Sequence, residues 1–198
     1  AYDKGEEWVF CGDIAVCAVE TLPTQGRHNA LNCLAAMAVA AAWITPEQMV
    51  RCISGFKALD HRFQRVAESF AITFINDSKA TNINSVIVAI EAFLKPIVLI
   101  LGGYNKGANF RLLLPHIKSS HVRDIVSYGD AGEQINTDLG DAVRSVLVTD
   151  LNSAVKRAQS MAAPGDIILL SPGCASFDEF SNFEERGNYF KSIVGIYK

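Results

Sequence analysis

The stretch Ile97-Val98-Leu99-Ile100-Leu101, followed at once by Gly102-Gly103, decides the fold class of this chain. Five consecutive aliphatic residues are typical of a strand that is buried on both faces, as in a parallel sheet covered by helices. A second run of this kind, Ile167-Ile168-Leu169-Leu170, lies near the end of the chain. Both runs predict central strands of a parallel sheet.

The segments around these runs alternate between strand-like and helix-like patterns. The expected strands are 71–75, 97–101, 122–127, 146–148 and 167–170. The helices expected after them are 82–94, 110–119, 132–139, 152–162 and 180–194. Repeated strand–helix–strand connections build a parallel sheet with helices on both faces. The sequence therefore predicts an α/β fold with a Rossmann-like, mostly parallel sheet.

The N-terminal part follows a different pattern. Strand-like residues occupy 8–22, and a helix rich in alanine and leucine is expected at 28–43, because both residues favour helix. The capping box Thr45-Pro46-Glu47-Gln48 predicts the start of a second helix. The pattern changes near residue 58, so we expect two domains, residues 1–58 and 59–198.

Composition and charge restrict the function classes. Of the 198 residues, 49% are hydrophobic and 20% are charged, as in globular proteins. The net charge of -3 gives no bulk attraction to nucleic acid or to an anionic membrane, so neither partner is expected. The most apolar helix-like segment, 31–44, is too short to span a bilayer. Five cysteines without a CxxC pair, and no secretory signal pattern, indicate free thiols in the cytoplasm.

Three loops stand out, because ligands bind open parallel sheets at the carboxyl ends of the strands. These loops are Asn76–Asn82, Gly102–Gly107 and Ser171–Ser176. Their small residues leave backbone N–H groups approachable, and Lys79, Lys106 and the helix N-termini attract negative charge. The loops predict an anion site. The alternative is that residues such as Asp77 and Thr81 only cap helices.

Other polar and aromatic residues are open to two interpretations. Asn29 and Asn32 share one helix face, where they can contact an adenine edge or cap the helix. His61-Arg62 reads as a structured linker on spacing alone, and Phe180 and Phe183 are typical of core packing. The histidines lack the spacing of metal ligands, so no metal site is assigned. No GxGxxG and no GxxxxGK[ST] occurs, so a dinucleotide site is disfavoured and the chain has no P-loop of its own.

Taken together, several segments resemble the Mur ligases, and within them the branch that adds D-glutamate. The segments are GRHNALN (26–32), LDHRF (59–63), NDSKATN (76–82), LGGYNKGANF (101–110), LSPGCASFDEF (170–180) and NFEERG (182–187). They run in the family's order from about Gly26 to Gly187, and the 76–82 and 170–180 segments are specific to that branch. Asn105, where aspartate is common, and Gly173, where alanine is common, are mild departures.

The resemblance implies a place for each part of the chain. Residues 1–58 would be the C-terminal remnant of the central ATPase domain, and residues 59–198 the whole third, Rossmann-like domain. The implied enzyme is an ATP-dependent ligase of peptidoglycan precursor synthesis in the bacterial cytoplasm. It activates UDP-N-acetylmuramoyl-L-alanine as an acyl phosphate, which the amine of D-glutamate attacks. The P-loop, a carbamylated lysine and the Mg²⁺ ligands would lie outside this chain, so we expect the chain alone to be inactive.

The resemblance also implies roles for individual residues. Asn32 would contact the adenine of ATP, Arg62 the nucleotide phosphates and Asp77 the ribose. Lys79 would lie beside the reacting centre as the catalytic residue. The residues implied to hold the D-glutamate carboxylates are Thr81, Lys106, Ser176 and, through its backbone, Phe183. Such groups orient and neutralise an amino acid rather than form covalent bonds to it.

Two further hypotheses compete with the ligase. One is a stand-alone, non-catalytic Rossmann-like domain that binds an acidic amino acid or a nucleotide. The other is an assembly domain that acts through its surface. We also expect residues 1–58 to expose apolar surface and to pair with another chain as a non-native dimer.

Overall fold

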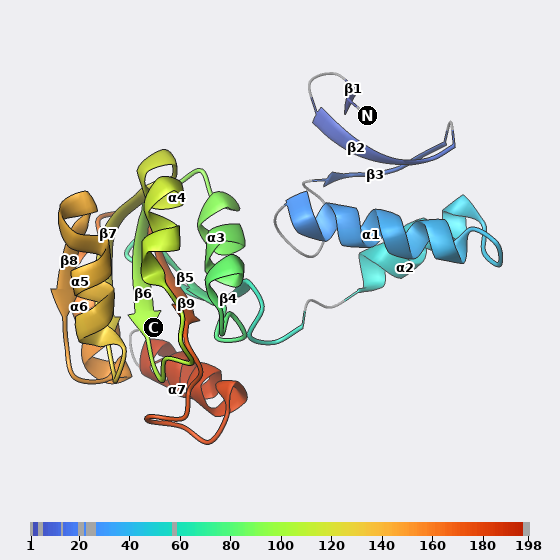
Figure 1. Cartoon of the computed structure of the whole chain (residues 1–198). Helices are drawn as coiled ribbons and strands as arrows, with labels where there is room; N and C mark the ends of the chain where they lie inside the picture. The colour runs from blue at the N-terminus through green and yellow to red at the C-terminus, as the bar shows by residue number, and fades with distance from the viewer. Residues whose placement is uncertain are drawn as a thin grey trace. The chain divides into compact units, whose positions relative to one another are not determined.

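The computed structural model describes residues 2–3, 6–12, 14–19, 22, 27–56 and 59–195. The chain divides into two compact units, Ala1–Leu59 and Asp60–Lys198, each of which is described by itself (Figure 1). No helix in these residues is both long and apolar enough to cross a membrane. Cys33, Cys52 and Cys174 are free thiols.

The first unit combines a three-stranded antiparallel sheet with two helices. Its elements are β1 (Tyr2–Asp3), β2 (Glu6–Cys11), β3 (Ile14–Ala18), α1 (Arg27–Ala40) and α2 (Pro46–Gly55). The predicted capping box is confirmed, because the side chains and backbones of Thr45 and Gln48 bond reciprocally. The expected helix at 28–43 ends three residues early, at Ala40.

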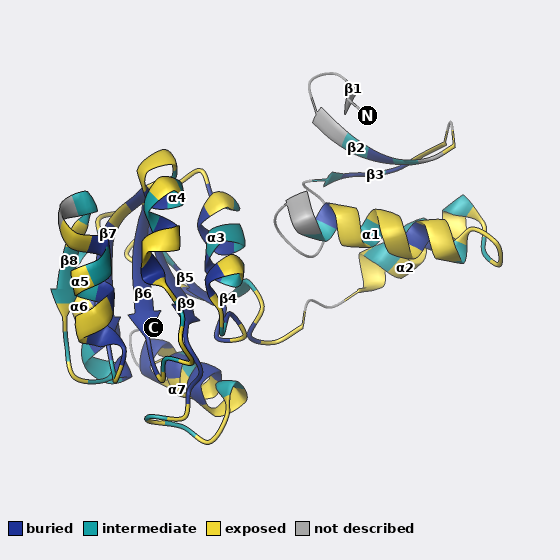
Figure 2. Ribbon diagram, in the orientation of Figure 1, coloured by how far each residue is buried: buried dark blue, intermediate teal, exposed yellow. Residues whose placement is uncertain are grey.

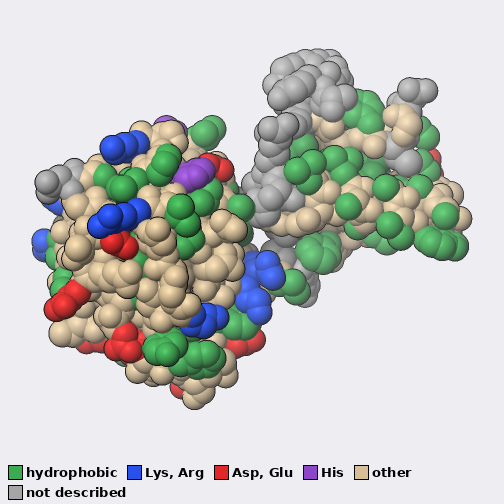
Figure 3. Space-filling model, viewed as in Figure 1, with side chains coloured by type: hydrophobic (Ala, Val, Ile, Leu, Met, Phe, Trp, Pro, Cys, Tyr) green, Lys and Arg blue, Asp and Glu red, His purple; other side chains and the backbone are tan. Residues whose placement is uncertain are grey.

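The surface of α1 is unusually apolar for an exposed helix. Leu31, Leu34, Val39 and Trp43, the last just beyond its end, are exposed, and Trp43 is 77% accessible. Figure 3 shows hydrophobic side chains spread over this helix. The expectation that residues 1–58 expose apolar surface is met among the described residues, whereas their pairing with another chain stays a prediction.

The second unit is a six-stranded sheet in the order β4-β5-β9-β6-β7-β8. The strands are β4 (Gln64–Ser69), β5 (Ile72–Asn76), β6 (Ile97–Gly102), β7 (Val122–Tyr128), β8 (Arg144–Leu147) and β9 (Ile167–Gly173). The helices are α3 (Ile83–Glu91), α4 (Leu114–Ser119), α5 (Gly132–Leu139), α6 (Leu151–Met161) and α7 (Phe183–Gly195), with short 3-10 turns η2 (Phe110–Leu113) and η3 (Gly140–Ala142). All pairings are parallel except β4 with β5, which confirms the predicted α/β, mostly parallel fold.

Alternate residues of the central strands enter two separate cores. Ile97, Leu99 and Leu101 pack under α3, α4 and α5, whereas Val98 and Ile100 pack under α6 and α7. The five aliphatic residues that decide the fold are therefore inaccessible on both faces (Figure 2). Each face of the sheet carries helices, as the sequence predicts.

Strand β4 is missing from the sequence-based prediction, which expected five strands and no antiparallel one. β4 is an edge strand rich in polar residues, so it has no apolar pattern. Its turn to β5 consists of Phe70 and Ala71, with φ of 51° and 59°. Two-residue hairpin turns with positive φ are normally marked by Asn-Gly or similar pairs, and that signal is absent here.

Predicted boundaries are also wrong at α3, which ends at Glu91 rather than at residue 94, at α7 and at β8. α7 begins at Phe183 rather than at residue 180, because the Asn182 side chain accepts a hydrogen bond from Glu185 N–H and ends the preceding loop. β8 spans 144–147 rather than 146–148. These shifts leave the strand order and the site unchanged.

Candidate functional site

The three predicted loops meet at one edge of the sheet, because β9 lies between β5 and β6. Asp77 N–H donates to Leu170 O at 2.8 Å, which joins the loop after β5 to β9. Tyr104 and Ala175 exchange two backbone bonds of 2.9 and 3.1 Å, which join the loops after β6 and β9. Gly103, at φ 117°, passes so close that a Cβ there would overlap Ala175 O.

Arg186, on α7, donates hydrogen bonds to two of these loops, the one after β5 and the one after β9. Its side chain is completely buried. Nε donates to Ser78 Oγ at 2.9 Å and Nη2 to Ser78 O at 2.8 Å. Nη1 donates to Cys174 O and Ala175 O, each at 3.1 Å. Ser78 Oγ in turn donates to Phe183 O at 2.8 Å, so α7 and both loops form one hydrogen-bonded frame.

No role is predicted for Arg186 from the sequence, although the residue lies within the segment NFEERG (182–187). A signal existed in the helix pattern. Arg186 shares a helical face with Phe190, Ile193 and Val194 at spacings of four, seven and eight residues, and all three are core residues. A charged residue on an apolar face is a candidate for a buried, hydrogen-bonded role.

Asp77 does not cap a helix, so that alternative is wrong. The residue is 4% exposed, and its carboxylate accepts hydrogen bonds from Ser171 Oγ, at 2.9 Å, and from the Phe63 N–H. Burial raises the pKa of Asp77 to about 7, while these bonds and the nearby Arg62 oppose the shift. The residue that caps α3 is Asn82, whose side chain accepts from Ser85 N–H at 2.9 Å.

Lys79 and Phe183 lie against each other. The ammonium of the exposed Lys79 stands 3.7 Å above the centroid of the Phe183 ring, in a cation–π contact. Phe183 is half-buried at the first position of α7. Phe180 packs against the core, as its alternative interpretation held. Phe183 therefore differs from a core residue in facing a charged group.

The remaining predicted site residues differ in exposure. Ser176 is buried, Thr81 is half-buried and Lys106 is exposed. Asn105 shapes the loop that carries Lys106: its Oδ1 accepts from Ala108 N–H at 2.6 Å, and its Nδ2 donates to Gln134 Oε1 at 2.8 Å. Asn105, which stands where the Mur ligases commonly have aspartate, therefore stabilises this loop through its side-chain amide.

The residues implied for the nucleotide lie in both units. Arg62 is exposed at the start of the second unit, close enough to Asp77 to affect its pKa. Asn32 is exposed on α1 of the first unit. The described residues contain no group of three or more His, Cys, Asp or Glu side chains that could hold a metal ion.

Comparison with known proteins places these features in a family. The family model described as "Mur ligase, glutamate ligase domain" matches residues 61–174. A UDP-N-acetylmuramoylalanine–D-glutamate ligase of Acidobacterium capsulatum is 41% identical over 180 residues, which cover 90% of this chain and 39% of that protein. The enzyme of the same name from Salinibacter ruber is 39% identical over 184 residues, covering 92% and 40%. The chain thus spans about two fifths of these relatives' length.

Solved structures show the same fold at low identity. The UDP-N-acetylmuramate–alanine ligase of Thermotoga maritima superposes with a TM-score of 0.67 at 16% identity, over 89% of this chain and 40% of that one. A bifunctional folylpolyglutamate synthase/dihydrofolate synthase of Yersinia pestis gives the same TM-score and identity, over 93% and 43%. With a family match over more than half of its residues, the chain belongs to the Mur ligase family, through its glutamate ligase domain.

Proposed function

We propose that this chain is part of an ATP-dependent ligase that adds D-glutamate to UDP-N-acetylmuramoyl-L-alanine in peptidoglycan precursor synthesis. The observation that carries the proposal is the meeting of three loops with hydroxyls, backbone amides and two lysines at one sheet edge. The names of the relatives support the same substrates. The second unit would be the domain that presents the amino acid.

The first unit would be the end of the central ATPase domain. The similarity to the Acidobacterium relative covers 180 residues, more than the second unit contains, so it extends into the first unit. ATP would supply the phosphoryl group that activates the alanyl carboxylate, and Mg²⁺ would accompany it. We assign the Mg²⁺ ligands to the central domain. The bacterial cytoplasm, where such precursors are assembled, is the proposed location.

In this proposal the D-glutamate carboxylates are held by hydrogen bonds and positive charge. Lys106 supplies a mobile cation, Thr81 and Ser176 supply hydroxyls, and Phe183 supplies backbone at the start of α7. Charge-assisted bonds of this kind fix both carboxylates and leave the amine free to attack the acyl phosphate. Lys79, beside the reacting centre, would stabilise the negative charge that develops in the tetrahedral intermediate.

The nucleotide contacts belong to the same proposal. Asn32 would reach the adenine, Arg62 the phosphates and Asp77 the ribose. Because Asp77 is only 4% exposed, the ribose would have to reach its carboxylate through the small part that remains accessible. The ribose hydroxyls would then donate to the carboxylate in its ionised form.

Titration of the chain with D-glutamate tests the amino-acid site. Replacing Lys106 by Ala or Ser176 by Ala removes one carboxylate partner, so the dissociation constant should rise at least about tenfold in each variant. Lys118→Ala, at an exposed lysine of α4, is the matched control and should bind as the parent chain does. Equal affinity for D-glutamate and L-glutamate, or no change in either site variant, would contradict the assignment.

A further inference from the structure

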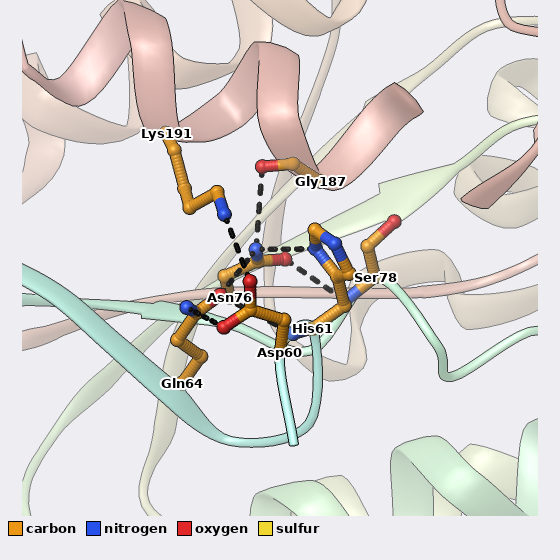
Figure 4. Close-up of polar contacts among 7 residues, drawn as sticks. All are labelled: Asp60, His61, Gln64, Asn76, Ser78, Gly187 and Lys191. Atoms are coloured by element: carbon orange, nitrogen blue, oxygen red, sulfur yellow. Dashed lines mark hydrogen bonds and ion pairs between the residues drawn. The ribbon is translucent and has the colours of Figure 1, made fainter. Parts of the chain in front are cut away.

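A buried polar network joins the start of the second unit to the site (Figure 4). His61 is 5% exposed and has a φ of 64°. Its Nδ1 lies 3.0 Å from Nδ2 of Asn76, the last residue of β5, which is completely buried. Either ring nitrogen of a neutral histidine can carry the proton, so the neighbours decide which one does.

Two backbone groups fix the orientation of the Asn76 amide. Asn76 Oδ1 accepts from Ser78 N–H at 3.1 Å, and Asn76 Nδ2 donates to Gly187 O at 3.2 Å. A peptide N–H can only donate and a carbonyl can only accept, so the amide cannot be reversed. Nδ2 also lies 3.2 Å from Gln64 Oε1, so its two hydrogens are shared among Gly187 O, Gln64 Oε1 and His61 Nδ1. Because Nδ2 cannot accept, a proton on His61 Nδ1 would point at it without a partner, and we expect Nδ1 to carry no proton. This arrangement favours a neutral ring with its proton on Nε2.

The same histidine contacts the loop after β5 and two successive turns of α7. Its carbonyl accepts from Lys79 N–H at 3.1 Å. Its ring meets the Phe183 ring edge-on, with 6.1 Å between the centroids. It also lies against Gly187, where any Cβ would overlap Nδ1. Gln64 Oε1 accepts from the His61 N–H at 3.2 Å, which completes the turn.

We propose that His61 is a positioning residue whose neutral ring locks the Arg62 segment to the loop that carries Lys79. The roles of Arg62 and Lys79 in this statement rest on the proposed function. Through this lock, the groups assigned to the nucleotide and to the amino acid keep a fixed spacing on one frame. A protonated ring would point an N–H at Asn76 Nδ2, which cannot accept it, and the lock would open.

The charged groups around the ring shift the pKa of His61 in opposite directions. Burial lowers the pKa of His61, and the ammonium of Lys191 on α7 lowers it further. Asp60 and Glu184 oppose this shift. Asp60 is bonded to Gln64 Nε2 at 2.5 Å and to Lys191 Nζ at 3.4 Å, so its charge is partly neutralised. The ring should therefore stay neutral at pH 7.

The first experiment reads the tautomer directly, without ligand. In the ¹⁵N-labelled chain, two-bond nitrogen–proton correlations should show His61 Nε2 protonated and Nδ1 bare at pH 7. A proton on Nδ1, or a doubly protonated ring at that pH, would overturn the proposal. Because the parent chain is used, the result does not depend on any variant folding.

The second experiment compares His61→Asn with His61→Leu. Asparagine supplies an acceptor near the position of Nδ1 and tolerates positive φ, whereas leucine does neither. Hydrogen exchange of the Lys79 amide should accelerate at least about tenfold in the leucine variant and about twofold or less in the asparagine variant. The amides of Leu99 and Ile125 in the central strands serve as controls for global unfolding. Unchanged Lys79 exchange in a folded leucine variant would refute the lock.

The third experiment measures how the hydrogen-exchange protection of the Lys79 amide depends on pH. In the parent chain its protection should fall as the pH drops below 6.5, through the lowered pKa of His61, and in His61→Asn this transition should be absent. A transition that persists in His61→Asn would assign it to another group and contradict the proposal. If D-glutamate binds to no variant, the proposed function fails while these ligand-free results stand.

Discussion

Arg186 is a buried cation that makes no ion pair among the described residues, and its hydrogen bonds explain how it is tolerated. A buried charge is costly unless its hydrogen-bonding groups are satisfied. Here the guanidinium donates to three carbonyls and one hydroxyl in two loops. Its positive charge is therefore kept unneutralised directly beneath the loops proposed to bind an anion.

Replacing Arg186 by methionine should strongly destabilise the chain. The carbonyls of Ser78 and Cys174 would lose their donor in a buried site, at a cost of roughly 1–3 kcal/mol for each unsatisfied group, whereas Ala175 O would keep its bond from Tyr104 N–H. Denaturant unfolding measures the loss. The matched control is Arg65→Met, at an exposed ion pair with Glu68 worth about 0–1 kcal/mol. Equal losses in the two variants would contradict a structural role for Arg186.

Asp77 should make stability depend on pH. Its pKa is about 7 in the folded chain and 3.8 as the ordinary value, so the folded state binds the proton more tightly. The stabilising contribution is complete below pH 3.8 and is lost as the pH rises through 7. Relative to the parent, Asp77→Asn should gain up to about 4 kcal/mol between pH 4 and 8. Carboxyl carbon chemical shifts should titrate near pH 7; a midpoint near 4 would refute this.

At the level of elements, apolar patterning predicted the buried strands and most helices, whereas β4 escaped it. An edge strand needs little apolar surface, and its turn at Phe70-Ala71 uses residues that rarely adopt positive φ. The start of α7 was within reach of the sequence, because Asn182 with Glu185 three residues later is a capping signature.

The β4–β5 turn should be improvable. Phe70 is exposed, and both turn residues have left-handed backbone that costs an L-residue about 1–2 kcal/mol. Phe70→Asn with Ala71→Gly should therefore raise the free energy of unfolding by roughly 1–2 kcal/mol. Ala163→Gly, at an exposed alanine whose φ is not positive, is the control and should destabilise slightly. A double variant no more stable than the parent would refute the argument.

At the scale of the whole molecule, topology explains why the candidate site could be predicted in outline. Parallel strands place their carboxyl ends together, so the loops of Lys79, Lys106 and Ser176 could be grouped from sequence alone. The contacts that join these loops could not be predicted from the sequence. The bonds of Arg186 and of His61 with Asn76 depend on packing between residues more than a hundred positions apart or across a loop, and no local pattern records them.

The apolar surface of α1 predicts self-association of the isolated chain. Leu31, Val39 and Trp43 are all exposed, and exposed apolar patches of this kind promote association. Light scattering should show an average mass that rises with concentration. Val39→Glu should weaken the association at least about tenfold, since it places a charge in the apolar patch. Thr137→Glu, on the exposed surface of α5, should not. A strictly monomeric parent at high concentration would disprove the prediction.

The position of β9 has a consequence for biosynthesis. This strand is the last of the sheet to be translated, yet it lies in the middle, between β5 and β6. A nascent chain that has emerged only as far as α6 holds two half-sheets with no partner between them. The three loops can meet only after β9 has inserted, and Arg186, which fastens them, leaves the ribosome later still. The proposed amino-acid site is therefore completed only after both β9 and α7 have been synthesised, and a product that terminates before β9 would contain most of the strands and helices of the second unit but not the assembled site.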